Sequence, residues 1–229
     1  MEFGNVELDF LGHSGFRIRI KNGSEKIIFI DPYNLDENAG KEKADIILIS
    51  HSHYDHCSIK DIEMIRKEGS IVICPADVQS KITRIENLRM ELIEAGDELS
   101  LNGLKIEAVP AYNTNSEREF HTKKDGWVGF IIKYGNVIIY HSGDSDRTRE
   151  MERLSGYGKQ GNTFIALLPV SGKYVMNADE AVEVAKIINP TIAIPMHYGS
   201  GVAGTIEDAE RFVKLCKENG VNAAVLDRV

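Results

Sequence analysis

The sequence predicts a mixed α/β (α+β) fold in which helices cover β-sheets. Short β-branched or alternating apolar runs fill the first third of the chain, and similar runs then alternate with amphipathic, helix-like stretches. This order favours sheets covered by helices over a single doubly wound sheet. The 229 residues are 42% hydrophobic and 27% charged, and they contain no linker-like stretch or repeat. We therefore expect a single domain spanning residues 1–229.

The expected strands are short and end at turn residues or prolines. Residues 16–20 alternate apolar and charged side chains, and Asn22-Gly23 predicts a tight hairpin into a strand that ends at Asp31-Pro32. The expected strands cover residues 6–11, 16–20, 26–30, 45–50, 71–74, 104–109, 128–133, 137–140, 164–168 and 192–194, with an edge strand at 223–226.

Capping residues mark the starts of the expected helices. Ser58 begins a helix that Gly69 ends, and a further helical stretch begins near residue 76. Asn177 caps an amphipathic helix over residues 178–188, and Thr205 opens a final helix to about residue 219.

Composition argues against several classes of partner. The net charge of −8 and pI near 5.4 disfavour a phosphate-backbone binder, so no nucleic acid partner is expected. The first residues lack a signal-peptide pattern, and no apolar run is long enough for a transmembrane segment. The three cysteines are odd in number and far apart, which favours reduced thiols and a cytoplasmic protein. Cys57 is expected to be a packing residue, and a homo-oligomer is compatible with the sequence.

Three histidines and an aspartate, His51, His53, Asp55 and His56, lie within six residues directly after the strand at 45–50. A helix would scatter these side chains, whereas an extended segment that then turns can bring them together. Imidazole and carboxylate groups are ligands suited to zinc, manganese or iron. The run therefore predicts a metal site at a strand tip.

Further candidate ligands follow other strands. A catalytic dinuclear site needs about six protein ligands with room for water. His141, Asp144 and His197 lie at strand ends, whereas His121 lies in the long polar segment 112–126. Asp144 could bridge two ions. His141 could either support the ligands from outside or be a packed histidine at the end of its strand.

The chain resembles the metallo-β-lactamase superfamily in four motifs, which occur in the expected order: the HxHxDH run, His121, the Gly143-Asp144 pair and His197. The resemblance covers nearly the whole chain and implies a four-layer αββα sandwich. Within the superfamily, the chain resembles the branch of L-ascorbate-6-phosphate lactonase-like and N-acylphosphatidylethanolamine phospholipase D-like hydrolases. The stretches that carry this second resemblance are residues 11–16, 30–32, 110–113, 127–130, 168–170 and 195–199.

The resemblance also implies a site for two divalent transition-metal ions. Zinc is the expected metal, with manganese or iron as alternatives. One ion would be bound by His51, His53 and His121, and His141 competes with His121 for this role. The other would be bound by Asp55, His56 and His197, with Asp144 bridging. Asp31 would either orient the histidine loop through hydrogen bonds or serve as a strand-end turn residue.

The implied activity is metal-dependent hydrolysis, in which a metal-activated water cleaves an ester, lactone or phosphodiester in a small, anionic substrate. Asp55 or Asp144 would accept the proton. The residues expected to contact the substrate are His13, Tyr112, Asn113, Lys173 and Tyr198. Lys173 suits an anionic group, since ammonium groups bind phosphate well, although an ordinary surface lysine is the alternative.

Other classes remain open on the sequence alone. A mononuclear iron dioxygenase on the same fold would share these ligands. A superfamily nuclease would need an RNA-gripping arm, for which this acidic chain has no evident room. A non-enzymatic metal-binding protein would have no need for an open coordination position.

Overall fold

The structure, a computed structural model, describes residues 1–229 except for the side chain of Ser24. The chain forms two compact units, one comprising Met1–Ile93 with Leu226–Val229 and the other Glu94–Val225. Each unit is built around one β-sheet. The predicted metal ligands are divided between the units, with the HxHxDH run in the first and the later ligands in the second.

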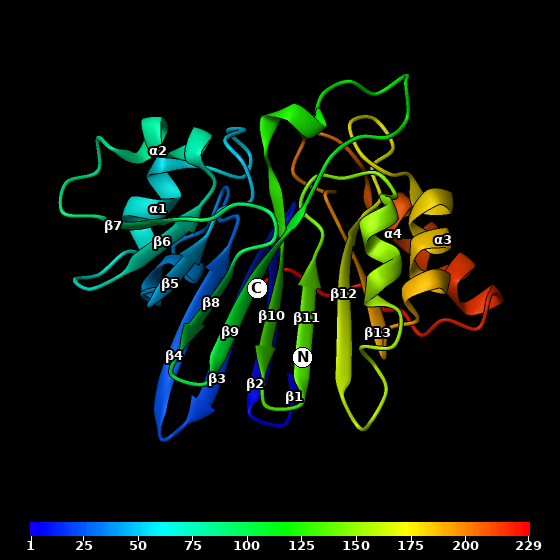
Figure 1. Cartoon of the computed structure of the whole chain (residues 1–229), viewed down its shortest axis with the longest axis horizontal. Helices are drawn as coiled ribbons and strands as arrows, with labels where there is room; N and C mark the ends of the chain where they lie inside the picture. Colours follow the sequence, from blue (N-terminus) through cyan, green and yellow to red (C-terminus); the bar gives the residue numbers. More distant parts are fainter. The chain divides into compact units, whose positions relative to one another are not determined.

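The sheet of the first unit follows the order of the sequence (Figure 1, blue to cyan). Its strands are β1 (Glu2–Phe3), β2 (Val6–Gly12), β3 (Gly15–Asn22), β4 (Ser24–Ile30), β5 (Ile46–Leu48), β6 (Ile71–Cys74) and β7 (Arg89–Leu92). Pairing is antiparallel up to β4 and parallel from β4 onward. Since β2, β4 and β5 run in one direction, the turn after β2, Asp31 after β4 and the His51 loop after β5 share one edge of the sheet.

Helices connect the parallel strands of this unit. They are η1 (Ala39–Lys41), α1 (Ile59–Ile65) and α2 (Ala76–Ile82). Ser58 caps α1 as predicted, accepting a hydrogen bond from the Asp61 amide, but the helix ends at Ile65, well before Gly69. Cys57 is 4% exposed and belongs to a hydrophobic cluster that includes Phe29. Burial raises the pKa of the Cys57 thiol to about 12, which fits the predicted packing role.

The sheet of the second unit has the order β13-β12-β11-β10-β9-β8 (Figure 1, green to orange). Its strands are β8 (Glu98–Leu101), β9 (Leu104–Pro110), β10 (Val128–Tyr134), β11 (Val137–His141), β12 (Thr163–Pro169) and β13 (Ile192–Met196). Since β9, β11, β12 and β13 run in one direction, their carboxyl ends lie at the same edge. Each is followed by a predicted site residue, namely Tyr112, Asp144, Lys173 and His197.

The helices of the second unit are η2 (Lys123–Asp125), η3 (Arg149–Leu154), α3 (Ala178–Ile188) and α4 (Ile206–Glu218). The bounds predicted for α3 are confirmed. Asn177 and Glu180 form a reciprocal capping box with two hydrogen bonds of 2.9 Å. Thr205 and Asp208 cap α4 in the same manner. α3 packs against β12, and α4 packs against β13.

Some expectations about secondary structure were wrong. The stretch 223–226 forms an isolated parallel bridge from Ala223 to Ala193 and no edge strand. β1, β7 and β8 were not expected, and each lies at an edge of its sheet. β7 and β8 alternate polar and apolar residues over only 4 positions each, and a run this short is a weak local signal, so their pairing depends on tertiary contacts that the sequence pattern does not show.

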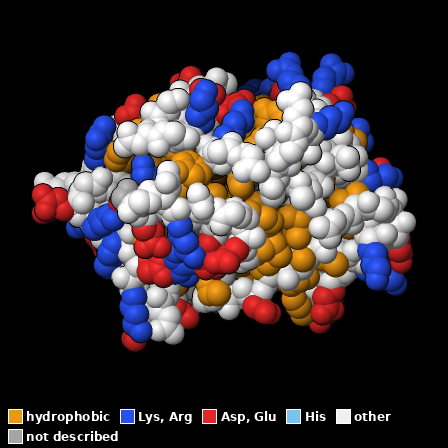
Figure 2. Space-filling model, turned by 90° about the horizontal axis from the view of Figure 1, so that it is seen from below, with side chains coloured by type: hydrophobic (Ala, Val, Ile, Leu, Met, Phe, Trp, Pro, Cys, Tyr) orange, Lys and Arg blue, Asp and Glu red, His pale blue; other side chains and the backbone are white. Residues whose placement is uncertain are grey.

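Charged side chains of both signs lie intermixed on the face of the molecule drawn in Figure 2, beside exposed hydrophobic side chains. In the first unit, Arg17 pairs with Asp9 at 2.9 Å and Arg19 pairs with Glu42 at 2.6 Å. These pairs neutralise both guanidinium groups with carboxylates of the same unit. Among the described residues, no helix has the length and apolar character needed to cross a membrane.

Candidate metal centre

The loop after β5 holds the HxHxDH run in a turned conformation. His51, Asp55 and His56 are buried, whereas His53 is partly exposed. The amides of His56 and Cys57 both donate to the His53 carbonyl, at 3.1 and 2.8 Å. His51 Nε2 lies 3.1 Å from His53 Nδ1. The segment therefore turns after His53, as expected, and gathers these side chains at one place.

Asp31, which follows β4, holds this loop through hydrogen bonds. Its fully buried carboxylate accepts the Ser50 amide at 2.7 Å, the Ser50 hydroxyl at 2.6 Å and the His56 Nδ1–H at 2.7 Å. Because the Ser50 hydroxyl donates to Asp31, its oxygen accepts from His51 Nδ1 at 2.9 Å. Both imidazoles therefore carry their proton on Nδ1 and present an unprotonated Nε2. This geometry favours the orienting role for Asp31 over a simple turn role.

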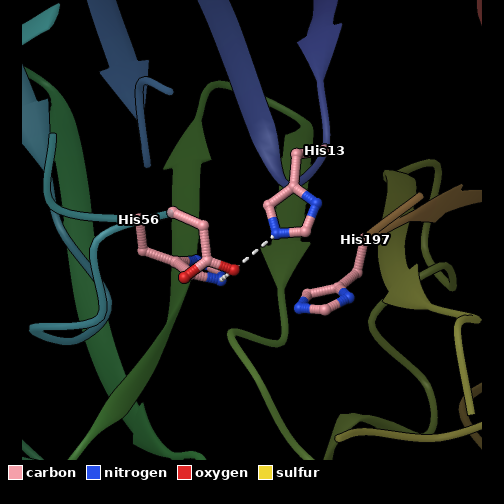
Figure 3. Close-up of side chains that lie close together, drawn as sticks. His13, His56 and His197 are labelled. Carbon is pink, nitrogen blue, oxygen red and sulfur yellow. Dashed lines mark hydrogen bonds and ion pairs between the residues drawn. The ribbon is translucent and has the colours of Figure 1, made fainter. Parts of the chain in front are cut away.

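His13 occupies the turn between β2 and β3 in a left-handed conformation with φ of 55°. Its ring is completely buried, and its Nε2 lies 2.9 Å from Asp55 Oδ2 (Figure 3). The ring also packs against His56, with centroids 5.4 Å apart. His13, which was predicted to contact substrate, is thus buried beside Asp55, one of the predicted metal ligands.

Asp144 is the centre of the ligand group in the second unit. Its Oδ2 lies 3.2 Å from His121 Nε2 and 3.0 Å from His197 Nε2. All three side chains are at most 3% exposed. His197, labelled in Figure 3, follows β13 with φ of 62°, and its Nδ1 is hydrogen-bonded to Ser171 Oγ at 2.9 Å. The structure therefore brings together the three predicted ligands of this unit.

His121 is held by the polar segment in which it lies. Its Nδ1 is 3.2 Å from the Tyr174 carbonyl oxygen, which can only accept, so Nδ1 carries the proton and Nε2 faces Asp144. Asn113 fixes the same arrangement, because its Oδ1 accepts the His121 amide at 2.9 Å and its Nδ2 donates to the Tyr174 carbonyl at 3.0 Å.

His141 takes a different position. Its Nδ1 accepts the Gly143 amide at 3.1 Å and thereby supports the turn that presents Asp144. Gly143 has φ of 61°, and a Cβ there would lie 2.6 Å from the Val128 carbonyl oxygen, so only glycine fits without strain. The geometry therefore favours His121 over His141 as the ligand beside Asp144.

The remaining predicted substrate contacts differ in exposure. Tyr112 donates its hydroxyl to Glu150 at 2.8 Å, Tyr198 is buried, and Asn113 holds the His121 segment. Lys173 is exposed, and its ammonium lies 4.9 Å from the centre of the Tyr174 ring. The segment around His121 also lines a cavity of about 430 Å³, whose lining includes Ser116, Arg118, Thr122, Lys123 and Lys124.

The donor atoms fit transition-metal ions. Imidazole nitrogens and carboxylate oxygens bind such ions at about 2.0–2.2 Å, so two ligands of one ion at a right angle lie about 3 Å apart. The pairs His51–His53, His121–Asp144 and His197–Asp144 lie at 3.1, 3.2 and 3.0 Å. These separations, together with burial of most of the donors, are those expected of ligands to transition-metal ions.

Several supporting residues were not predicted. Ser50 and Ser171 bond the Nδ1 atoms of His51 and His197, and a hydroxyl residue directly before His51 was a signal for the first. Arg118 joins the His121 segment to α3 through Glu180, a pairing 62 residues apart that no local pattern indicates.

Comparison with known proteins agrees with this geometry. The sequence profile of the Beta-lactamase superfamily domain matches residues 7–197. The UPF0173 metal-dependent hydrolase of Thermoplasma acidophilum is 32% identical over 201 residues, covering 86% of this chain and 84% of the relative. That of Thermococcus onnurineus is 30% identical over 219 residues, covering 92% of each. A solved structure from Parabacteroides distasonis, described as a metal-dependent hydrolase, superposes with a TM-score of 0.81 at 28% identity, covering 97% of this chain and 94% of that one.

The chain therefore belongs to the metallo-β-lactamase superfamily. Within that superfamily its curated relatives are the UPF0173 metal-dependent hydrolases. The predicted fold class, a mixed α/β fold with two sheets of the metallo-β-lactamase type, is confirmed. The predicted enzyme class, a metal-dependent hydrolase, is confirmed at the level of the family.

Proposed function

We propose that the protein is a dinuclear hydrolase that cleaves an ester, lactone or phosphodiester bond in a small, anionic substrate. His51, His53 and His121 would hold one ion. Asp55, His56 and His197 would hold the other, and Asp144 would bridge them. The two units would then act as one catalytic domain over residues 1–229. Zinc is the favoured metal, with manganese or iron as alternatives.

The orientation of the imidazoles carries this proposal. His51, His56 and His121 each donate Nδ1–H to an oxygen partner, which leaves Nε2 as the ligand atom. Outer hydrogen bonds of this kind are a regular feature of metal-binding histidines. A solvated polar loop or a structural histidine would not need the same tautomer at three separate positions.

Divalent ions at such a centre supply Lewis acidity and lower the pKa of a bound water toward about 7. Asp55 and Asp144 are the buried carboxylates of this chain that can accept a proton from the attacking water and return it to the leaving group. Neither a serine nor a cysteine nucleophile is required, and burial raises the pKa of Cys57 to about 12.

Lys173 supports the choice of an anionic substrate. It is exposed and lies one residue before Tyr174, whose carbonyl orients His121. Replacing Lys173 by Gln should raise KM for a phosphorylated ester but not for its neutral analogue, with kcat unchanged. Lys214→Gln, an exposed site on α4, is the matched control. Equal effects on both substrates would argue against this role.

The test of the function combines metal analysis with a hydrolysis screen. Up to two transition-metal ions per chain are expected, and both His51→Ala and Asp144→Ala should lose metal and activity together. The screen, with zinc and with manganese, covers lactones, phosphodiesters and thioesters. Sugar-phosphate lactones come first because of the resemblance to the lactonase-like branch. Oxygen uptake by iron-loaded protein without any hydrolysis would favour a dioxygenase instead.

A pair of asparagine variants tests the assignment of His121. In His121→Asn, the amide can still donate to the Tyr174 carbonyl, but the Nε2 ligand is lost, so metal content should fall. In His141→Asn, the amide oxygen can still accept the Gly143 amide, so metal content should remain. The opposite pattern would make His141 the ligand.

A further inference from the structure

His13 is a bulky, non-glycine residue in a left-handed turn, and the strain of this conformation needs a chemical explanation. A non-glycine residue in the left-handed region costs about 1–3 kcal/mol, and such residues concentrate at functional sites. Glycine or asparagine would fit φ of 55° with less strain. His13 nevertheless occupies this position with its ring fully buried, and the polar atom that the turn presents is Nε2.

The donor atoms around His13 have the spacing of ligands on one ion. His13 Nε2 lies 2.9 Å from Asp55 Oδ2, and His56 Nε2 lies 3.8 Å from the same oxygen. One ligand atom from each of these three residues lies within 4.8 Å of the other two. Ligands at about 2.1 Å from an ion are about 3.0 Å apart at a right angle and about 3.4 Å apart at a tetrahedral angle. The 2.9 Å separation resembles the 3.1 Å between His51 and His53, which the proposed function assigns to one ion.

We propose that His13 is an additional protein ligand, through Nε2, of the ion assigned to Asp55, His56 and His197. This inference rests on the proposed dinuclear centre. With Asp144 bridging, the ion would have five protein ligands and a position left for water. Six-coordinate surroundings of nitrogen and oxygen suit manganese, iron or cobalt better than zinc, which is usually four-coordinate in proteins.

The competing explanation is that His13 only donates a hydrogen bond to Asp55 and thereby orients it. Two variants separate these roles. His13→Gln retains an N–H donor near the position of Nε2 but is a poor ligand for transition metals, whereas His13→Leu removes both functions. A ligand role predicts that Gln and Leu behave alike, and an orienting role predicts that Gln behaves as wild type.

The measurement is titration of metal-free protein with Co²⁺, followed by visible absorption, with circular dichroism as the check on folding. For His13→Gln we expect the affinity for one of the two Co²⁺ ions per chain to fall by more than about 100-fold. Loss of a residue that only hydrogen-bonds to a ligand typically costs about 10–100-fold. The absorption band of the weakened Co²⁺ ion should also shift in position and intensity. Wild-type affinity and spectrum in His13→Gln would overturn the ligand assignment, whatever the Leu variant does.

A measurement on the unchanged protein covers the case in which the variants do not fold. In the Co²⁺-loaded wild type, each coordinated imidazole retains one N–H whose proton resonance is strongly shifted by the paramagnetic ion. The five histidines of the proposed function together with His13 would give six such signals, and five would overturn the inference. A protein that binds no Co²⁺ at all would contradict the proposed function itself, so the two failures are distinguishable.

Discussion

Arg118 is expected to stabilise the second unit more than any exposed ion pair, because it is buried and joins three segments. Its Nη1 donates to the Val175 carbonyl at 2.7 Å and to Glu180 at 2.8 Å, and its Nη2 donates to Glu180 at 2.6 Å. Its Nε lies 3.1 Å from Asp146 Oδ1. The hydrogen bonding to Glu180 raises the pKa of the Arg118 guanidinium despite its burial. Arg118→Met keeps an unbranched apolar stem and removes all of these bonds.

The expected loss in the free energy of unfolding depends on the carboxylates that Arg118→Met leaves without their cationic partner. Removing one partner of a buried ion pair costs about 3–5 kcal/mol. The lower end applies here, since the Glu180 side chain is 35% exposed and Asp146 still accepts the amides of Thr114 and Asn115 at 2.9 Å each. A loss of about 3 kcal/mol corresponds to a fall in Tm of roughly 6–12 °C for a chain of this size. The same change should loosen the segment that holds His121 and weaken metal binding roughly 10–100-fold.

The assay compares thermal unfolding of Arg118→Met with that of Arg211→Met. Arg211 makes a bidentate pair with Asp179 at 2.8 and 2.9 Å, but both side chains are more than half exposed. An exposed pair contributes at most about 1 kcal/mol, so this control should change Tm by no more than a few degrees. Equal shifts in the two variants, with unchanged metal affinity in Arg118→Met, would refute the reasoning.

Three further outcomes are expected. Asp31→Asn, which fits the left-handed φ of 43°, should lower metal affinity about 10–100-fold in a chelator competition, and unchanged affinity would remove Asp31 from the orienting role. Gly143→Ala should destabilise the protein by at least about 1 kcal/mol more than Gly135→Ala in urea, because an added Cβ meets the Val128 carbonyl at 2.6 Å at the first site and nothing within 4 Å at the second. Burial raises the pKa of Glu150, but hydrogen bonds from its lysine and tyrosine partners outweigh this and lower the pKa to about 2. Since a lowered pKa stabilises the folded state above the unfolded value near 4.3, Glu150→Gln should cost less than about 1 kcal/mol at pH 6, and a difference that persists as pH falls to about 2 would contradict this.

Local signals predicted most of the scaffold. Asn177 and Thr205 carry capping chemistry within four residues, so the starts of α3 and α4 could be predicted from the sequence. The strand before His51 is buried on both faces and reads as a continuous apolar run. β7 and β8 could not be predicted because edge strands with charged side chains depend on their neighbours, and the 223–226 run, although apolar, forms only a bridge.

The ligand types could be predicted from the sequence more readily than their supports. The spacing of His51, His53, Asp55 and His56 placed them in one loop, and the structure shows the turn that gathers them. The buried contact of His13 with Asp55 depends on antiparallel pairing between β2, β3 and β4, which a linear pattern does not show. The substrate could not be predicted further than its class, because the exposed side chains that would select it leave no periodic signal in the sequence.

Electron paramagnetic resonance of the Mn²⁺-loaded protein tests the central claim, a single dinuclear centre bridged by Asp144. Two manganese ions that share one carboxylate are magnetically coupled. The wild type loaded with two equivalents should therefore give a coupled spectrum, and Asp144→Ala should lose the coupling together with most of the bound metal. Two equivalents bound as magnetically isolated ions in the wild type would contradict the account.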